Sequence, residues 1–292
     1  MVDADMRGGH RLRLDLRSGT EWLAYYTRDF DNHLIAAACA LMTEPGCVAI
    51  DAGANIGFWS VPLARRALEL QGGIVAFEPV PSNAARLQHN LRMNGLLQVA
   101  EIIPAALSDS SGEATMILRE DFEEGAATGN ASIEIPDGRD DRYSSVQVAT
   151  VTLDECAISA LGRGALRVIK CDIEGHEDRF LSGATDTVAR HRPIIFLEWN
   201  RAYYDRRRVD QTAQVQPFLD KLQYRTLLRT DGAWKPALEF RSPRPFDDLV
   251  VVPDDEIAAT VSALEVAYSP YRRRRSCDGA SLKGGRDRPG QC

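Results

Sequence analysis

The chain of 292 residues lacks any apolar run long enough to cross a membrane. Its longest run, IAAACALM at 35–42, is far shorter than the roughly 20 apolar residues of a helical span. The N-terminal stretch MVDADMRGGHRLRLDLRSG is polar and carries acids, so it also lacks the apolar segment of a secretory signal. We therefore predict a cytoplasmic protein with no membrane partner.

Paired cysteines are also missing. The six cysteines form no C-x-x-C pair and no spacing typical of zinc ligands, which predicts reduced thiols. Acidic residues outnumber basic ones outside the C-terminal end: the formal net charge is -7, although residues 272–292 hold seven Lys or Arg and only two Asp. An acidic body argues against broad nucleic-acid binding. The sequence contains no internal repeat.

Three common motifs are absent: G-x-G-x-x-G, G-x-x-x-x-G-K-[ST] and G-x-S-x-G. Their absence argues against a dinucleotide oxidoreductase, a P-loop phosphoryl-transfer enzyme and a serine hydrolase. The chain has instead VAIDAGANIG at 48–57, a short apolar strand that ends in an acid and a glycine-rich turn that opens a helix. Such a turn predicts a nucleotide-like cofactor at the carboxyl edge of a parallel sheet.

Apolar strands and amphipathic helices alternate along the first two thirds of the chain. Helices are expected at 60–70, 81–94 and 177–190, and the helix at 60–70 begins late because it contains Pro62. The strands between them are expected at 47–50, 74–77, 100–107, 166–171 and 194–197. Strands that alternate with helices over short connections predict an α/β fold with a doubly wound, mostly parallel sheet.

The remaining segments predict additions to this core. Residues 1–43 form an N-terminal cap or lid, with a strand near 11–16 and a helix from about Asp29 that packs over the cofactor turn. Residues 114–152 form a hairpin excursion with a polar loop at 119–146. The domain proper runs over 44–268, with a helix at 215–222, strands at 224–229 and 248–252 and a last helix at 254–268. A disordered basic tail follows at 269–292.

Acidic residues follow the strands of the predicted sheet. Asp51, Glu78, Asp172 and Glu198 lie at or just past strand ends, and Asp109 follows the third strand. Carboxyl ends of parallel strands meet at one edge, so these acids are expected in one cleft. Asp51 beside the first turn favours a cationic cofactor, and Glu78 is placed to accept hydrogen bonds from ribose hydroxyls. S-adenosylmethionine meets both conditions.

Several motifs in this order resemble the FkbM-type family of S-adenosylmethionine-dependent methyltransferases. The resemblance covers about residues 44–200 and rests on IDAGANIG (50–57), VAFEP (75–79), LQHNLRMNGL (87–96), AALSDSSG (105–112), VTLDE (151–155), IKCDIEGHE (169–177) and PIIFLEWN (193–200). It implies a seven-stranded, Rossmann-like class I methyltransferase fold. It also implies O-methylation of a hydroxyl on a sugar or a small natural product, and hence a role in natural product biosynthesis.

The resemblance also implies roles for individual residues. Glu78 would hold the ribose, Ser108 and Asp109 would face the adenine, and Asp172 would lie nearest the sulfonium and the acceptor. The methionine end of the cofactor would be lined by Asp51, Gly53, Asn55 and Gly57.

A hydroxyl acceptor loses a proton during methylation, which calls for a base. The candidates are Asp172, Glu174 and His176, which stand together after the fourth core strand. His176 is equally consistent with a solvated residue at a helix start. The same group offers ligands for a divalent cation, but no helical ligand pair accompanies it, and we predict no metal.

The acceptor is expected to be a small molecule, bound by Tyr26, Glu198, Trp199 and Asn200. N-methylation and carboxyl methylation stay open, because the segments that would choose the acceptor lie outside the motifs. A nucleotide-binding oxidoreductase and a non-catalytic cofactor-binding protein are the alternatives from other classes. Neither the acceptor nor the oligomeric state can be read from the sequence.

Overall fold

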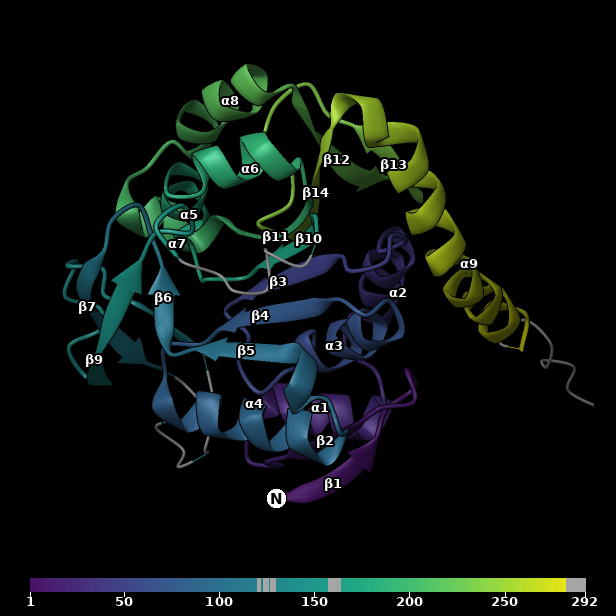
Figure 1. Cartoon of the computed structure of the whole chain (residues 1–292), viewed down its shortest axis with the longest axis horizontal. Helices are drawn as coiled ribbons and strands as arrows, with labels where there is room; N and C mark the ends of the chain where they lie inside the picture. Colours follow the sequence, from purple (N-terminus) through teal and green to yellow (C-terminus); the bar gives the residue numbers. More distant parts are fainter. Residues whose placement is uncertain (120–121, 123–125, 127–129, 157–163, 282–292) are drawn as a thin grey trace, which may run out of the picture.

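The protein is described by a computed structural model covering residues 1–119, 122, 126, 130–156 and 164–281. Its main sheet has eight strands in the order β13-β12-β14-β11-β10-β3-β4-β5 (Figure 1). Their bounds are β3 (Val48–Ala52), β4 (Gly73–Phe77), β5 (Ala100–Ile103), β10 (Leu166–Cys171), β11 (Ile194–Asn200), β12 (Tyr224–Thr230), β13 (Ala233–Pro236) and β14 (Phe246–Pro253).

The five strands from β5 to β11 are parallel, and β14 runs antiparallel between β11 and β12. These seven strands confirm the predicted doubly wound sheet. The eighth, β13, is joined to β12 by a two-residue turn, Asp231-Gly232, in which both residues have positive φ. That backbone matches the twist of a hairpin, which is why Asp-Gly is common there.

Helices cover both faces of the sheet. One face of the sheet packs on α2, α3, α4 and α9, and the core between them includes Leu34, Leu63, Leu87 and Leu264. The other face packs on α5, α6 and α8, and its core includes Phe180, Val188 and Val215. The helices are α1 (Gly19–Thr27), α2 (Asn32–Leu41), α3 (Ser60–Glu69), α4 (Pro81–Met93), α5 (Glu177–Ser182), α6 (Thr185–His191), α7 (Arg201–Arg207), α8 (Gln211–Leu222) and α9 (Ile257–Ser281), with short 3₁₀ turns at Leu97–Val99 and Asp254–Glu256.

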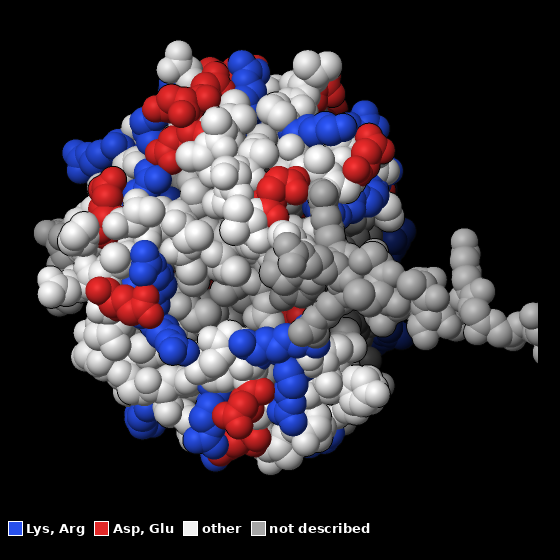
Figure 2. All heavy atoms as spheres, turned by 90° about the vertical axis from the view of Figure 1, so that its right-hand side faces the viewer, with Lys and Arg blue, Asp and Glu red and all other residues white. Residues whose placement is uncertain are grey.

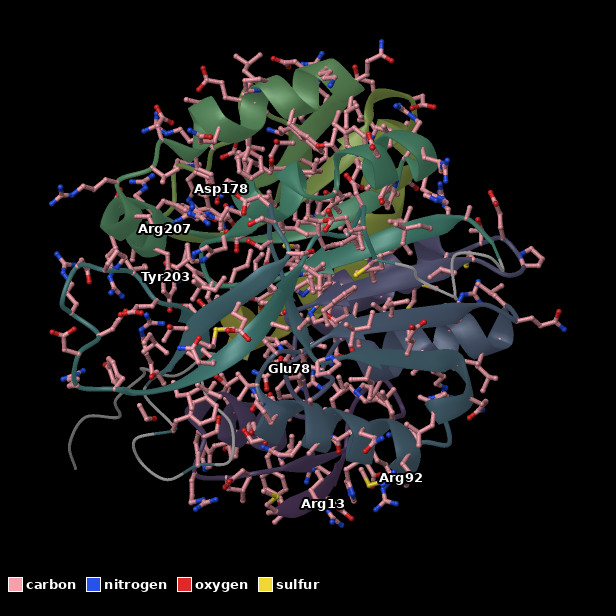
Figure 3. The ribbon with its side chains drawn as sticks, turned by 60° about the vertical axis from the view of Figure 1, so that its left-hand side comes forward. Arg13, Glu78, Arg92, Asp178, Tyr203 and Arg207 are labelled. Carbon is pink, nitrogen blue, oxygen red and sulfur yellow. The ribbon has the colours of Figure 1, made fainter. Side chains whose placement is uncertain are left out.

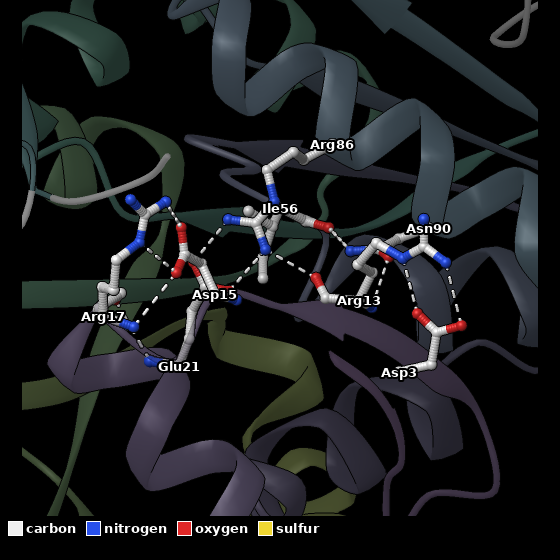
Figure 4. Close-up of polar contacts among 9 residues, drawn as sticks. Asp3, Arg13, Asp15, Arg17, Glu21, Ile56, Arg86 and Asn90 are labelled. Carbon is white, nitrogen blue, oxygen red and sulfur yellow. Dashed lines mark hydrogen bonds and ion pairs between the residues drawn. The ribbon is translucent and has the colours of Figure 1, made fainter. Parts of the chain in front are cut away.

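The N-terminal segment is tied to α4 by a buried ion pair. It forms a hairpin of β1 (Val2–Asp5) and β2 (Arg11–Leu14), followed by α1 and α2. Arg86 of α4 donates to both carboxylate oxygens of Glu21 at 2.7 and 2.6 Å and to the carbonyl of Arg13 at 2.7 Å (Figure 4). Glu21 is 2% exposed. The segment therefore has a fixed position against α4.

The third predicted strand is broken in the structure. We predicted one strand at 100–107, but β5 ends at Ile103 and Pro104 separates it from β6 (Ala105–Leu107). Proline has no N–H to donate to a strand ladder, and the chain leaves the edge of the main sheet at this residue. β6 pairs with β9 in a second sheet that contains β7 (Gly112–Leu118), β8 (Ala131–Ile133) and β9 (Ser144–Val151) in the order β6-β9-β7-β8.

Two helix predictions also differ from the structure. The helix expected at 177–190 is split into α5 and α6 around Gly183, where an added Cβ would lie 2.1 Å from the carbonyl oxygen of Ser108. The last helix was expected to end at Tyr268, with disorder from 269, but α9 continues to Ser281. Residues 282–292 lie outside the described part.

The surface over α2 and α9 carries both signs of charge. Figure 2 shows Lys and Arg interspersed with Asp and Glu over this face. Within the described residues, none of the helices combines the length and the apolar character that a bilayer crossing requires.

The buried pair generates a prediction about stability. Arg86→Met leaves the Glu21 carboxylate buried without its cation, so we expect the free energy of unfolding to fall by about 3 kcal/mol. Urea denaturation followed by circular dichroism measures this change. Asp3→Asn, which breaks the solvent-exposed pair with Arg13, serves as the control and should leave the midpoint nearly unchanged. Equal effects of the two variants would contradict the assigned role of Arg86.

Candidate functional site

A cavity of about 760 Å³ lies at the carboxyl edge of the parallel strands. Its walls come from the ends of β3, β4, β10 and β11, from the segment around α1 and α2, and from the second sheet with α7. The predicted site residues that line it are Asp51, Gly53, Asn55, Glu78, Asp172, Glu174, His176, Glu198 and Asn200. In Figure 3, Glu78 lies at the end of β4 and Tyr203 on the side of α7.

The turn after β3 is shaped by close backbone packing. Gly53 has φ +79°, and a Cβ there would lie 1.9 Å from the carbonyl oxygen of Asp172. Gly57, with φ +97°, packs against Leu87 below the turn and does not line the cavity. Because both positions exclude a side chain, the backbone of the turn forms the wall of the cavity.

Asp51 stands at the base of this turn. It is 1% exposed and accepts a 2.6 Å hydrogen bond from the hydroxyl of Ser60, the first residue of α3. Burial raises the pKa of Asp51 to about 6, although the bond from Ser60 and the charge of Lys170 oppose the shift. A cation bound beside Asp51 would favour its ionised form.

Glu78 organises the neighbouring wall. Its carboxylate accepts hydrogen bonds from the N–H groups of Asn55 at 2.7 Å and Val80 at 2.9 Å. Burial raises its pKa to about 7. Asn83 of α4 lines the same part of the cavity, is 2% exposed, and its Oδ1 has no hydrogen-bond donor among the described residues. A buried acceptor without a donor indicates a ligand with hydroxyl or amino hydrogens.

Ser108 and Asp109 lie beside the cavity but do not line it. Leu107, the last residue of β6, is the lining residue of this segment. Ser108 is buried, and its hydroxyl lies 3.2 Å from Oδ1 of Asp109, which also lies 3.8 Å from Arg179. Their predicted contact with adenine therefore stays a prediction.

The turn after β10 presents Asp172 and Glu174 to the cavity. Glu174 has φ +54° and Gly175 φ +90°, and a Cβ on Gly175 would lie 2.2 Å from the Cβ of Tyr203. Burial, together with the charges of Asp172 and Glu177, raises the pKa of Glu174 to about 8. One carboxylate oxygen from each of Asp172, Glu174 and Glu198 lies within 4.8 Å of the other two.

His176 and Glu177 have different surroundings from those of Glu174. His176 precedes α5 and is 4% exposed; burial and the charges of Arg207 and Arg179 lower its pKa to about 3. Glu177 accepts hydrogen bonds from the hydroxyl of Tyr204 and the N–H of Gly175. His176 is therefore neutral near pH 7, and Glu177 supports the turn.

The predicted acceptor wall is only partly assembled. Glu198 and Asn200 line the cavity, whereas Trp199 packs against Tyr204 on the opposite face. Alternation along β11 explains this, because successive side chains of a strand point to opposite faces. Tyr26 is 76% exposed, stacks on Trp22 and does not line the cavity.

The charged residues of the cavity that the sequence analysis missed include Lys170, Asp31 and Asp248. Lys170 of β10 is 3% exposed, its Nζ lies 3.9 Å from Asp172, and it stands 5.1 Å from the ring of Trp59. Burial disfavours its ammonium form, but nearby carboxylates outweigh this and raise the pKa of Lys170. Asp31 and Asp248 complete the wall. The position of a lysine within the mostly apolar strand LRVIKC could have identified Lys170 as a site residue. No sequence pattern singled out Asp31 or Asp248.

The residues present fit S-adenosylmethionine. Gly53 lines the cavity with its backbone, and Asp51 offers a carboxylate to a cationic group. Glu78 and the unpartnered Oδ1 of Asn83 offer acceptors for ribose hydroxyls. These groups match the cationic part and the ribose of this cofactor.

Comparisons with known proteins identify the family of the chain. The model of the methyltransferase FkbM domain matches residues 51–226. Similar solved structures include the methyltransferase FkbM from Methylobacillus flagellatus, with 17% identity over 73% of this chain and a TM-score of 0.44. This chain spans 45% of the length of that protein. Another is an O-methyltransferase from Thermotoga maritima, with 12% identity, 76% of this chain, 64% of that chain and a TM-score of 0.37.

None of the curated sequences compared with the chain matches it. The family match covers more than half of the chain and includes the turn after β3, Glu78 and the turn after β10. It confirms the resemblance predicted from the motifs and, with it, S-adenosylmethionine as the cofactor of the family. The chain belongs to the FkbM family of methyltransferases.

Proposed function

We propose that the protein is an S-adenosylmethionine-dependent O-methyltransferase whose acceptor is a hydroxyl of a sugar or a small natural product. One observation carries the proposal: a single cavity contains both the cofactor walls at Asp51 and Glu78 and the ionisable turn at Asp172 and Glu174. A methyl donor and a hydroxyl acceptor bound in one cavity can be aligned for in-line transfer.

The chain would hold the cofactor through the first two strand ends. Asp51 and the backbone from Gly53 to Asn55 would contact the methionine part, and Glu78 with Asn83 would contact the ribose. When bound, S-adenosylmethionine supplies an electrophilic methyl group. Lys170 places a cation 3.9 Å from the carboxylate of Asp172 in the wall of the cavity.

Glu174 is the base that the surroundings favour. It would accept the proton of the hydroxyl while the oxygen forms its bond to the methyl carbon. A base is most effective when its pKa lies near the working pH, and Glu174 meets this condition with a pKa of about 8. His176, with a pKa of about 3, binds a proton too weakly for this role and would instead offer a hydrogen bond.

The acceptor would be positioned by residues from β11 and α7. Glu198, Asn200 and Tyr203 line the cavity on this side and offer hydrogen-bonding groups to a polyhydroxylated molecule. Trp199 and Tyr26, which we had expected in the acceptor wall, do not reach the cavity.

The function can be tested by incubating the chain with S-adenosylmethionine labelled in its methyl group. The acceptors are a panel of glycosides and hydroxylated metabolites, analysed by mass spectrometry for a methyl ether. The proposal expects at least one methylated hydroxyl, and Asp172→Asn should reduce the yield. Tight cofactor binding without transfer to any acceptor would favour the non-catalytic alternative.

Cofactor affinity provides a second test. Glu78→Gln removes the charged acceptor that faces the ribose, so we expect S-adenosylhomocysteine to bind roughly 10- to 100-fold more weakly. Isothermal titration calorimetry measures the loss. Glu113→Gln removes an exposed carboxylate on β7 and serves as the matched control. Unchanged affinity in Glu78→Gln would contradict the ribose assignment.

The dependence of kcat on pH distinguishes the two candidate bases. Ionised Glu174 is the active form, so kcat should rise about tenfold per pH unit below pH 8 and level off above it. Glu174→Gln should remove this rise. A histidine base with a pKa of about 3 predicts a flat profile between pH 5 and 9, and that result would rule against Glu174.

A further inference from the structure

We propose that the methylated molecule carries a protonated amine, as an amino sugar does, and that Asp31, Glu198 and Asp248 bind this amine. The inference rests on the proposed methyltransferase function and concerns the acceptor part of the same cavity. It follows from three observations: an excess of carboxylates in that part of the cavity, the like charges of Glu198 and Asp248 on neighbouring strands, and the buried Nδ1 of His176, which has no hydrogen-bond partner among the described residues.

The acceptor part of the cavity has more acids than cations. Four acids line the cavity around Lys170. They are Asp31, which precedes α2, Asp172, which follows β10, Glu198 of β11 and Asp248 of β14. One buried ammonium group balances only one carboxylate. Bound S-adenosylmethionine adds a single net positive charge, so an excess of negative charge persists beside the acceptor.

Glu198 and Asp248 stand directly opposite each other in the antiparallel pair of β11 and β14. Like charges at such positions destabilise a sheet. Neither carboxylate accepts a hydrogen bond from a residue that the structure describes. Burial and neighbouring acids raise the pKa of Asp248 to about 7 and that of Glu198 well above its ordinary value. A cation between them would relieve this repulsion and hold both groups ionised.

His176 gives an independent indication of a polar ligand. It lines the same cavity and is 4% exposed, and its Nδ1 has no partner within the described part of the chain. A buried polar atom of this kind costs free energy unless something binds it. Because His176 is neutral near pH 7, it adds no positive charge and can accept a hydrogen bond from an amine or a hydroxyl.

The arginines of the cavity do not offset the acids. Arg119 pairs with Asp140, and Arg206 pairs with both Asp137 and Asp140 at 2.9 and 2.8 Å. Arg139 lies 3.6 Å from Asp137. These three arginines share two carboxylates and leave one positive charge, on the exposed side chain of Arg139, whereas three acids around Lys170 are unbalanced. The acceptor part of the cavity therefore favours a ligand with positive charge and disfavours one with a carboxylate. This argues against the carboxyl methylation that the sequence left open.

The test compares three sugars that differ in charge. The chain is saturated with S-adenosylhomocysteine and titrated by calorimetry at pH 7.5 with the methyl glycosides of glucosamine, glucose and glucuronic acid. We expect the glucosamine derivative to bind at least tenfold more tightly than the glucose derivative, and the glucuronic acid derivative to bind most weakly. Asp248→Asn should reduce the preference for the amine at least fivefold.

Glu239→Gln is the matched control, because it removes an exposed acid that does not line the cavity. The inference would be overturned if the three glycosides bound with equal affinity or if the glucosamine derivative did not bind. It would also be overturned if Asp248→Asn left the preference for the glucosamine derivative intact. So would tight binding of Mg²⁺ alone that excludes the amine, because the carboxylates would then serve a metal. Failure of S-adenosylhomocysteine to bind would overturn the proposed function as well; its binding without amine preference overturns only the inference.

Discussion

Burial of ionisable groups at one edge of the sheet is the constraint on which the site depends. Lys170 extends from the largely buried strand β10, and it is opposite Asp51 in the pairing of β10 with β3. A lone buried ammonium would lose its proton or unfold the strand, so the acids of the neighbouring strands must converge on it. Burial raises the pKa values of Asp51, Glu198 and Asp248, and a positively charged ligand beside them would favour their ionised forms.

The rest of the molecule closes this edge. The N-terminal segment brings Asp31 to the cavity, and the Glu21–Arg86 pair fixes that segment against α4. On the other side, Pro104 turns the chain out of the main sheet, which allows β6 and the second sheet to form a wall. The cavity therefore belongs to no single motif. It arises where three separately built parts of the chain meet.

The motifs identified two turns that line the cavity, because the features that define these turns are local. A glycine with positive φ after β3 and an acid after β4 are properties of short stretches, and both occur at the expected positions. The acceptor wall was predicted less well. Trp199 was chosen as an aromatic next to Glu198, yet strand alternation directs it to the other face. Asp248 was missed because its strand runs antiparallel, so its first residues, and not its last, reach the functional edge.

The sequence by itself determined the alternation of strands and helices, the strand ends that carry acids, and the family, because each of these is encoded within segments of about ten residues. The tertiary structure alone decided the order of the eight strands, the break of the third strand at Pro104, and the meeting of Asp31, Lys170 and Asp248. These features depend on pairing between residues far apart in the chain. Burial also sets the charge states of Glu174 and His176, and no local pattern reports how much water a side chain loses on folding.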